Sequence, residues 1–201
     1  MTKKLHHTKK TSWFAHLAQR LKKRIGPTLD NKDELLILLR EAEQSSLLNT
    51  DTLLMMESVL EFSDMRVRDI MIPRTQMTTV SIDAEWEALV DIVHTSGHSR
   101  FPVMGEHRDE VIGILHAKNL LMYQLPDTPK FNLKDILKPV MFVPESKHLD
   151  ILLKEFRRNR NHMAIVVDEY GGICGFVTIE DLIEQIVGDI EDEFDIDEDA
   201  Y

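Results

Sequence analysis

Thr178 and Asp181 are the residues whose types and spacing could do chemistry. An apolar strand is expected to end at Val177 and a helix to begin at Thr178 or Ile179. The exposed N–H groups and the positive dipole end of such a helix attract phosphate. The Asp181 carboxylate can accept hydrogen bonds from two adjacent hydroxyls, such as those of a ribose. The alternative is a capping box, in which the two side chains only close the helix start, and the spacing alone favours it.

Other candidate groups give weaker signals. His94 and His98 have the four-residue spacing of two metal ligands on a helix, but Gly97 interrupts that helix and no third ligand is near, so no metal site is predicted. Cys174 is the single cysteine and is interpreted as a structural thiol. An enzyme, for example a phosphohydrolase using Asp181 and the acidic C-terminal run with a metal, lacks a positioned base or nucleophile and is not expected.

The elements that must position Thr178 and Asp181 occur twice. Segment 67–73 resembles segment 133–139, with Pro73 matching Pro139. The spacing between the repeats is about 60 to 65 residues. After each proline the pattern predicts, in order, an extended stretch, an amphipathic helix, an apolar strand, a strand opening with glycine, and a helix. In the first repeat these lie at 78–81, 86–93, 101–104, 113–115 and 118–121, and in the second at 141–143, 149–156, 163–167, 175–177 and 180–183.

This repeat predicts an α/β (α+β) fold of two β-α-β-β-α units. One unit of about 55 residues would bury too little surface to be stable alone. Two related units packed sheet to sheet around a pseudo-twofold axis share a core and form a cleft, which is a common place for a small ligand. The expected organisation is a helical extension at 1–63, a first repeat at 64–125, a second repeat at 131–188 and an acidic tail at 189–201.

Charge is unevenly distributed along the chain, which has a net charge of −11. Residues 1–24 contain eight Lys/Arg and no acid, and residues 189–199 contain eight Asp/Glu and no base. The acidic middle argues against nucleic acid as a partner. No apolar run is long enough to span a membrane and no secretory signal is evident, so a cytoplasmic protein is expected. A basic amphipathic helix from Trp13 to Ile25 is expected to pack on its own domain or a partner, with peripheral contact at the inner membrane as the alternative.

Several motifs then resemble one family in order and spacing. They are D-M-R-V-R-D-I-M-I-P-R at 64–74, S-R-F-P-V at 99–103, V-D-E-Y-G-G at 167–172, T-I-E-D-L-I-E at 178–184 and V-G-D-I-E-D-E at 187–193. Together they resemble the CorC/HlyC family, whose members carry a tandem CBS-domain pair, also called a Bateman module. The resemblance covers roughly residues 30–195. It implies a regulatory role in magnesium and cobalt efflux.

The resemblance also implies a ligand, an adenine nucleotide such as AMP or ATP, the latter with Mg²⁺ bridging its phosphates. The site would hold the nucleotide with Thr178 and Asp181, and Arg100 is the nearest cation for a phosphate, with an ordinary surface salt bridge as its alternative. Methionines such as Met77 and Met163 are more often core residues that fill gaps than ligand contacts, and both roles are compatible at the wall of a cleft. The remaining residues implied for the site are Thr78, His98, Ser99, Phe101 and Phe176.

The first repeat departs from the motif. His116 and Asn119 occupy the positions of Thr178 and Asp181, so the carboxylate is missing and a second, weaker site is expected there. The favoured function is a nucleotide-sensing regulatory pair that forms a homodimer and acts with a membrane cation-transport system. The alternative is a dimerisation or interaction module whose nucleotide cleft is vestigial.

Overall fold

A computed structural model of the protein describes residues 31–107, 110–124 and 130–188. The predicted basic helix at Trp13–Ile25 and the acidic tail lie outside the described residues. Contacts divide the chain into two compact units, residues 1–57 and residues 58–201. No helix in the described part of the chain is both long and apolar enough to cross a bilayer.

In the first unit, the described residues form α2 (Lys32–Gln44) and the start of α3 (Thr50–Phe62). The side chain of Asn31 caps α2 by accepting a hydrogen bond from the Asp33 N–H. At the start of α3, Thr50 is already helical, and the Asn49 side chain accepts the Thr52 N–H at 2.8 Å. Asparagine is the better cap because its short side chain carries a carbonyl acceptor.

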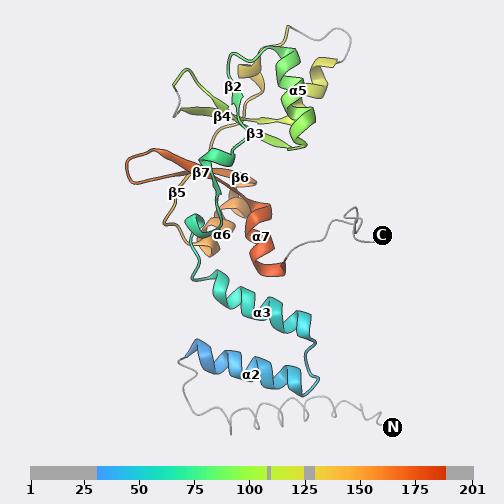
Figure 1. The fold of residues 1–201 in the computed structure, drawn as a ribbon, viewed down its shortest axis with the longest axis vertical. Coiled ribbons are helices and arrows are strands. Elements are labelled where there is room, and N and C mark those ends of the chain that lie inside the picture. The colour runs from blue at the N-terminus through green and yellow to red at the C-terminus, as the bar shows by residue number, and fades with distance from the viewer. Residues whose placement is uncertain (1–30, 108–109, 125–129, 189–201) are drawn as a thin grey trace, which may run out of the picture. The chain divides into compact units, whose positions relative to one another are not determined.

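The second unit contains both predicted repeats (Figure 1). In the first repeat, β2, β3 and β4 form one sheet with α5 against it, and in the second, β5, β6 and β7 form most of another with α6 and α7. The first repeat comprises α4 (Val67–Ile70), β1 (Ile72–Pro73), η1 (Arg74–Gln76), β2 (Val80–Ser81), α5 (Trp86–Ser96), β3 (Arg100–Met104), β4 (Val111–His116) and η2 (Ala117–Gln124). The second comprises η3 (Leu133–Ile136), β5 (Phe142–Pro144), α6 (Leu149–Asn159), β6 (Met163–Val167), β7 (Ile173–Thr178) and α7 (Ile179–Val187).

The repeats exchange their opening segments, which the sequence pattern did not predict. Strand β1 of the first repeat pairs with β7 of the second, with Ile72 opposite Phe176. Reciprocally, Lys138 of the second repeat bridges Ile114 in β4 of the first, with backbone hydrogen bonds of 2.9 Å in both directions. The two pairings are equivalent by the repeat alignment. Each sheet is therefore completed by backbone from the other repeat, and the two repeats form one folding unit.

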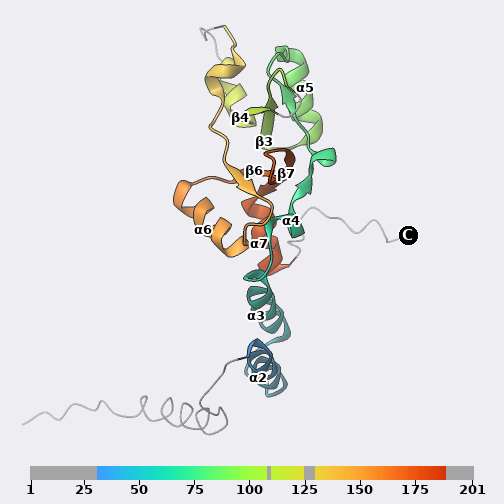
Figure 2. The same cartoon turned by 90° about the vertical axis from the view of Figure 1, so that its left-hand side faces the viewer.

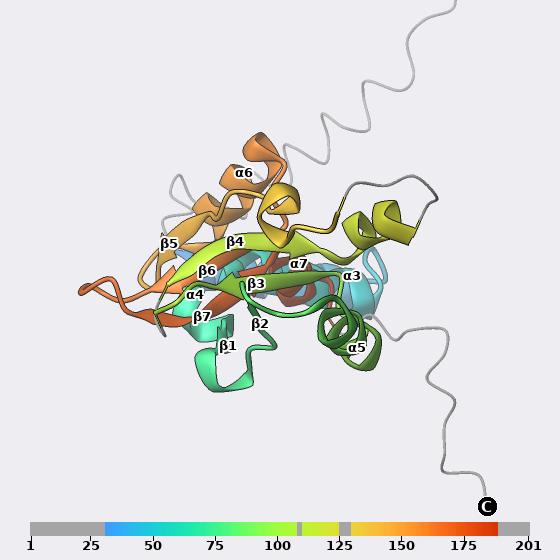
Figure 3. The same ribbon diagram turned by 90° about the horizontal axis from the view of Figure 1, so that it is seen from above.

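Three apolar clusters hold this unit together. One lies under the first sheet around Phe101 and Leu115, and a second lies under the other sheet around Phe156 and Val177. The third joins the sheets, because it contains Ile114 of β4 beside Ile165 of β6. Figures 2 and 3 are two perpendicular views, and both show β3 and β4 stacked over β6 and β7. The structure confirms the predicted mixed α/β fold and its sheet-to-sheet packing.

Candidate functional site

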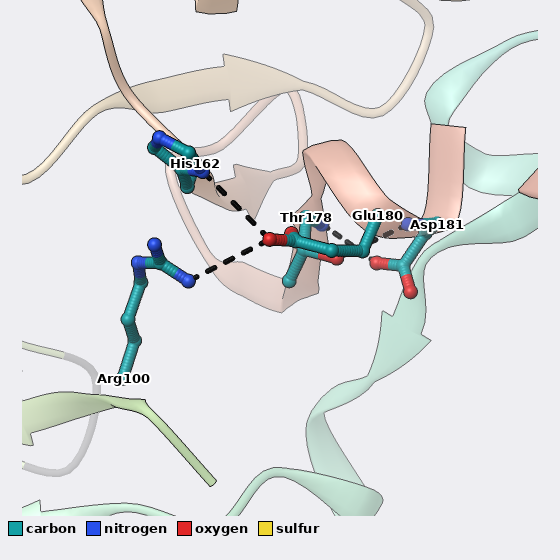
Figure 4. A network of polar contacts seen from close by, with 5 residues as sticks. All are labelled: Arg100, His162, Thr178, Glu180 and Asp181. Carbon is teal, nitrogen blue, oxygen red and sulfur yellow. Dashed lines mark hydrogen bonds and ion pairs between the residues drawn. The ribbon is translucent and has the colours of Figure 1, made fainter. Parts of the chain in front are cut away.

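Thr178 and Asp181 lie where β7 passes into α7, and they form a complete capping box (Figure 4). The Thr178 hydroxyl accepts the Asp181 N–H at 3.2 Å, and Oδ2 of Asp181 accepts the Thr178 N–H at 2.6 Å. Within the described residues, Oδ1 of Asp181 makes no hydrogen bond. The capping geometry thus uses one carboxylate oxygen and leaves the other able to accept a ligand hydroxyl.

The strand register identifies the equivalent positions of the two repeats. Thr178 lies opposite Met163, and His116 lies opposite Arg100. The residue after each of these positions donates its backbone N–H to the carbonyl of the residue that precedes the neighbouring strand. In the second repeat Ile179 donates to His162, and in the first Ala117 donates to Ser99, both at 3.0 Å. His162 is therefore the second-repeat counterpart of Ser99.

Glu180, the residue before Asp181, lies beside basic side chains of both repeats. Its Oε1 lies 3.7 Å from Nη1 of Arg100 in β3 and 3.7 Å from Nδ1 of His162 before β6, as Figure 4 shows. The structure thus brings Arg100 of the first repeat beside the helix start of the second. It also gives Arg100 the salt bridge that was its alternative interpretation.

Positive charge gathers around the same point. Burial lowers the pKa of His116, and the nearby charges of Arg100, Lys118, Lys138 and His162 lower this pKa further. Those groups come from both repeats, in a chain whose net charge is −11. A local excess of cations in an acidic protein favours binding of an anion.

The other predicted site residues are placed in three ways. Met77, Met163 and Phe176 pack in the cluster between the sheets, so they line the contact of the two repeats. The ring of Phe101 is fully buried in the first-repeat core, so that side chain is not available to a ligand as the sequence had suggested. His98 and Ser99 are exposed and Thr78 is half-buried, and in the described part of the chain no hydrogen bond or ion pair joins any of them to Thr178 or Asp181.

The first-repeat equivalents are built differently. Asn119 donates its side-chain amide to the Ile136 carbonyl at 3.3 Å, so the group corresponding to the Asp181 carboxylate is used within the core. His116 is half-buried among the cations described above. This position therefore offers an imidazole, whose neutral form the lowered pKa favours, where the second repeat offers a hydroxyl.

Sequence reasoning missed His162 and Glu180. A signal for His162 was present, because the repeat alignment makes it the counterpart of Ser99, which was predicted. Glu180 carried no such signal, since a glutamate in a helix's first turn is ordinary.

A cavity of about 300 Å³ lies elsewhere, at the hairpin end of the first sheet. Met77 is the one predicted site residue among its lining groups, and Thr178 and Asp181 do not line it. Its walls are formed by Arg74, Met77, Thr79, Met104, Gly105, Glu106, His107 and Ile173. Among the described residues, no three metal-ligating side chains gather at one point.

Comparisons with known proteins identify the family of this chain. The sequence-family model of the CBS domain matches residues 67–125 and 133–188, and the family model called the N-terminal region of NMB0537 matches residues 27–62. The chain therefore belongs to the CBS-domain family and carries two CBS domains in tandem.

Its pair is of the CNNM/CorC type. It is 50% identical over 170 residues to the magnesium and cobalt efflux protein CorC of Pasteurella multocida, covering 85% of this chain and 57% of that protein. The match to CorC of Escherichia coli K12 is also 50% identical, over 169 residues, covering 84% and 58%. The chain thus spans about three fifths of the length of these relatives.

Solved structures show the same fold. A conserved domain of unknown function from Neisseria meningitidis MC58 is 53% identical with a TM-score of 0.70, covering 75% of this chain and 97% of that one. The CBS domain of a bacterial CNNM/CorC family Mg²⁺ transporter in complex with ATP is 43% identical with a TM-score of 0.64, covering 68% and 97%. A CBS-domain pair with bound AMP from Klebsiella pneumoniae is 34% identical with a TM-score of 0.54, covering 61% and 98%.

Proposed function

We propose that this CBS pair binds one adenine nucleotide between its repeats and thereby regulates a membrane system for magnesium and cobalt efflux. The observation that carries the proposal is the Thr178–Asp181 pair, whose capping box leaves Oδ1 of Asp181 unused at a helix start where Glu180 pairs with Arg100 of the other repeat. The names of the relatives support the transport role, and the ATP and AMP complexes of similar CBS domains support the ligand class.

Each part of the nucleotide has a matching group in the proposal. Asp181 accepts the ribose hydroxyls through Oδ1, and the start of α7 with Arg100 attracts the phosphates. The adenine enters the edge of the apolar layer that contains Met77, Met163 and Phe176, where apolar side chains cover its faces. With ATP, Mg²⁺ neutralises part of the added phosphate charge. His116 and Asn119 give at most a second, weaker site, because Asn119 is already hydrogen-bonded to the core.

Regulation follows from binding across the repeats. A ligand that contacts both repeats stabilises the arrangement in which its contacts are complete, and only this difference in affinity can shift the conformation. The proposed role is therefore non-catalytic. The cytoplasmic location expected from the sequence stays a prediction.

A homodimer is part of the same proposal. Exposed apolar side chains lie on the last helix of each repeat, Leu121 (63% exposed) in η2 and Ile183 (39%) in α7. The two positions are equivalent by the repeat alignment, so together they could form a self-complementary surface, as a twofold dimer requires. Sedimentation equilibrium of the purified chain tests this assembly.

The decisive experiment is titration calorimetry with AMP, ADP and ATP, each with and without Mg²⁺. Replacing Asp181 with alanine should weaken binding by about tenfold or more, the scale of a hydrogen bond to a charged group. Asn119→Ala is the matched control in the first repeat and should change the affinity by less than about twofold, because its hydrogen bond is internal.

Two further measurements make the result interpretable. Asp181→Asn retains an acceptor for the Thr178 N–H, so a loss of affinity in this variant does not come from loss of the helix cap. Circular dichroism melts verify that every variant is folded. Equal binding by wild-type protein and Asp181→Ala contradicts the site. No binding at all supports the vestigial module, and nucleotide turnover that Asp181→Ala abolishes supports an enzyme.

A further inference from the structure

Glu180 occupies an unusual position in the proposed site. It follows the helix cap directly and precedes Asp181, yet its carboxylate takes no part in the capping box. One oxygen, Oε1, lies 3.7 Å from a nitrogen of one basic side chain in each repeat, Arg100 and His162. Because 61% of the side chain is exposed, no packing forces it into this place. Its orientation is explained by the attraction of the Arg100 guanidinium, with the His162 ring as a second contact.

The side chains that Glu180 contacts are the ones best placed for a phosphate. Arg100 projects from β3 of the first repeat with 24% of its side chain exposed, and it forms an ion pair with Glu180. His162 directly precedes Met163, which is the first residue of β6. A carboxylate and a phosphate are both oxyanions, and an arginine binds either through the same N–H groups.

We propose that Glu180 is an internal competitor of the nucleotide phosphates, holding Arg100 and His162 across the two repeats until a phosphate displaces it. The inference rests on the proposed function and adds to it a means of regulation. Without nucleotide, the contact between the first repeat and α7 is Arg100 to Glu180. With nucleotide, it becomes Arg100 to phosphate, and the Glu180 carboxylate turns to solvent.

The strength of these contacts suits such an exchange. Exposed ion pairs contribute little to the stability of a fold, because water and salt screen the attraction between the charges. A phosphate with two negative charges can therefore displace a single carboxylate at small cost. The competition also discriminates among ligands, since adenosine has no phosphate and does not compete for the cations.

The test is Glu180→Gln, which retains the size of the side chain and removes its charge. In titrations of the full chain, this variant should bind ATP about threefold more tightly than wild type, the scale of one exposed ion pair. Its affinity for adenosine, measured by displacement of a bound fluorescent adenine nucleotide, should equal that of wild type. Glu184→Gln is the matched control, because it removes the same charge from an exposed position of α7, and it should leave both affinities unchanged.

The variants also test whether the effect passes through the cation. In an Arg100→Gln background, most of the gain from Glu180→Gln should disappear. An unchanged or weaker affinity of Glu180→Gln for ATP overturns the inference, as does an equal gain for adenosine or an equal gain in Glu184→Gln. These failures differ from failure of the proposed function, which shows as wild-type protein that does not bind ATP or as ATP binding that is insensitive to Asp181→Ala.

Discussion

The two CBS repeats of this chain share their strands and differ in the helix that follows. Both have a bulge at the same place, between Val103 and Met104 in one and between Val166 and Val167 in the other. After the last strand, however, the second repeat continues into the α-helix α7, whereas the first continues into the 3-10 helix η2. The two repeats thus share the arrangement of their strands but differ in the helix that follows the last strand.

The cause lies in the first turn of each helix. In α7, Thr178 and Asp181 satisfy each other's N–H groups, and Glu180 and Asp181 place negative charge at the positive end of the helix dipole. In η2 the first turn contains no acidic residue, and Asn119 donates to the Ile136 carbonyl instead of closing the helix. The two repeats thus share their strand pairing and differ in two or three cap residues, and the proposed difference in ligand binding rests on those residues.

The largest expected effect tests the part that the repeats share. Gly113 and Gly175 are equivalent, and each lies against the opening segment of the other repeat. A Cβ at Gly175 would collide with the Ile72 carbonyl, which is backbone, whereas a Cβ at Gly113 would lie 2.8 Å from side-chain atoms of Leu137. Gly175→Ala should therefore destabilise the protein by roughly 3 kcal/mol or more, and Gly113→Ala by about 1 to 3 kcal/mol.

Urea denaturation followed by circular dichroism measures both changes. Since a side chain can shift more easily than a strand, the second-repeat variant should always be the less stable of the two. The opposite order would mean that the exchange of Ile72–Pro73 into the second sheet contributes little to the fold.

A smaller effect is expected at the position where the repeats differ. Thr178→Ala removes the hydroxyl that accepts the Asp181 N–H, and should lower the free energy of unfolding by about 1 kcal/mol. His116→Ala, at the equivalent position, removes no cap and should change it by less than about 0.5 kcal/mol. Both are measured by urea denaturation at pH 8. Equal losses would show that the capping box is not what separates the two repeats.

The sequence alone was enough for the shared features of the repeats and not for the contacts between them. The alignment of Pro73 with Pro139 and of Gly113 with Gly175 predicted equivalent positions, because close backbone approaches leave glycine and proline at fixed places. The exchange of Ile72–Pro73 was not predictable, since a strand of two residues has no periodicity. Phe101 was assigned to the site although it is core, because its strand is apolar on both faces. Contacts such as Arg100–Glu180 join distant segments and require the packed structure.

The smallest expected effect concerns the charge at His116. Burial, followed by the nearby cations headed by Arg100, lowers the pKa of His116 from its ordinary value of 6.5. The unfolded chain therefore binds a proton more readily than the folded one, so the stabilisation from a neutral His116 is complete above pH 6.5 and is lost as the pH falls through the lowered pKa. His116→Thr, which installs the residue of the second repeat, should make stability decline less between pH 7.5 and pH 5 in urea titrations. His94→Gln, at an exposed position of α5, is the control and should leave the decline unchanged. If His116→Thr declines as steeply as wild type, the cationic surroundings of His116 do not distinguish the first repeat energetically, and the difference between the repeats reduces to the capping box alone.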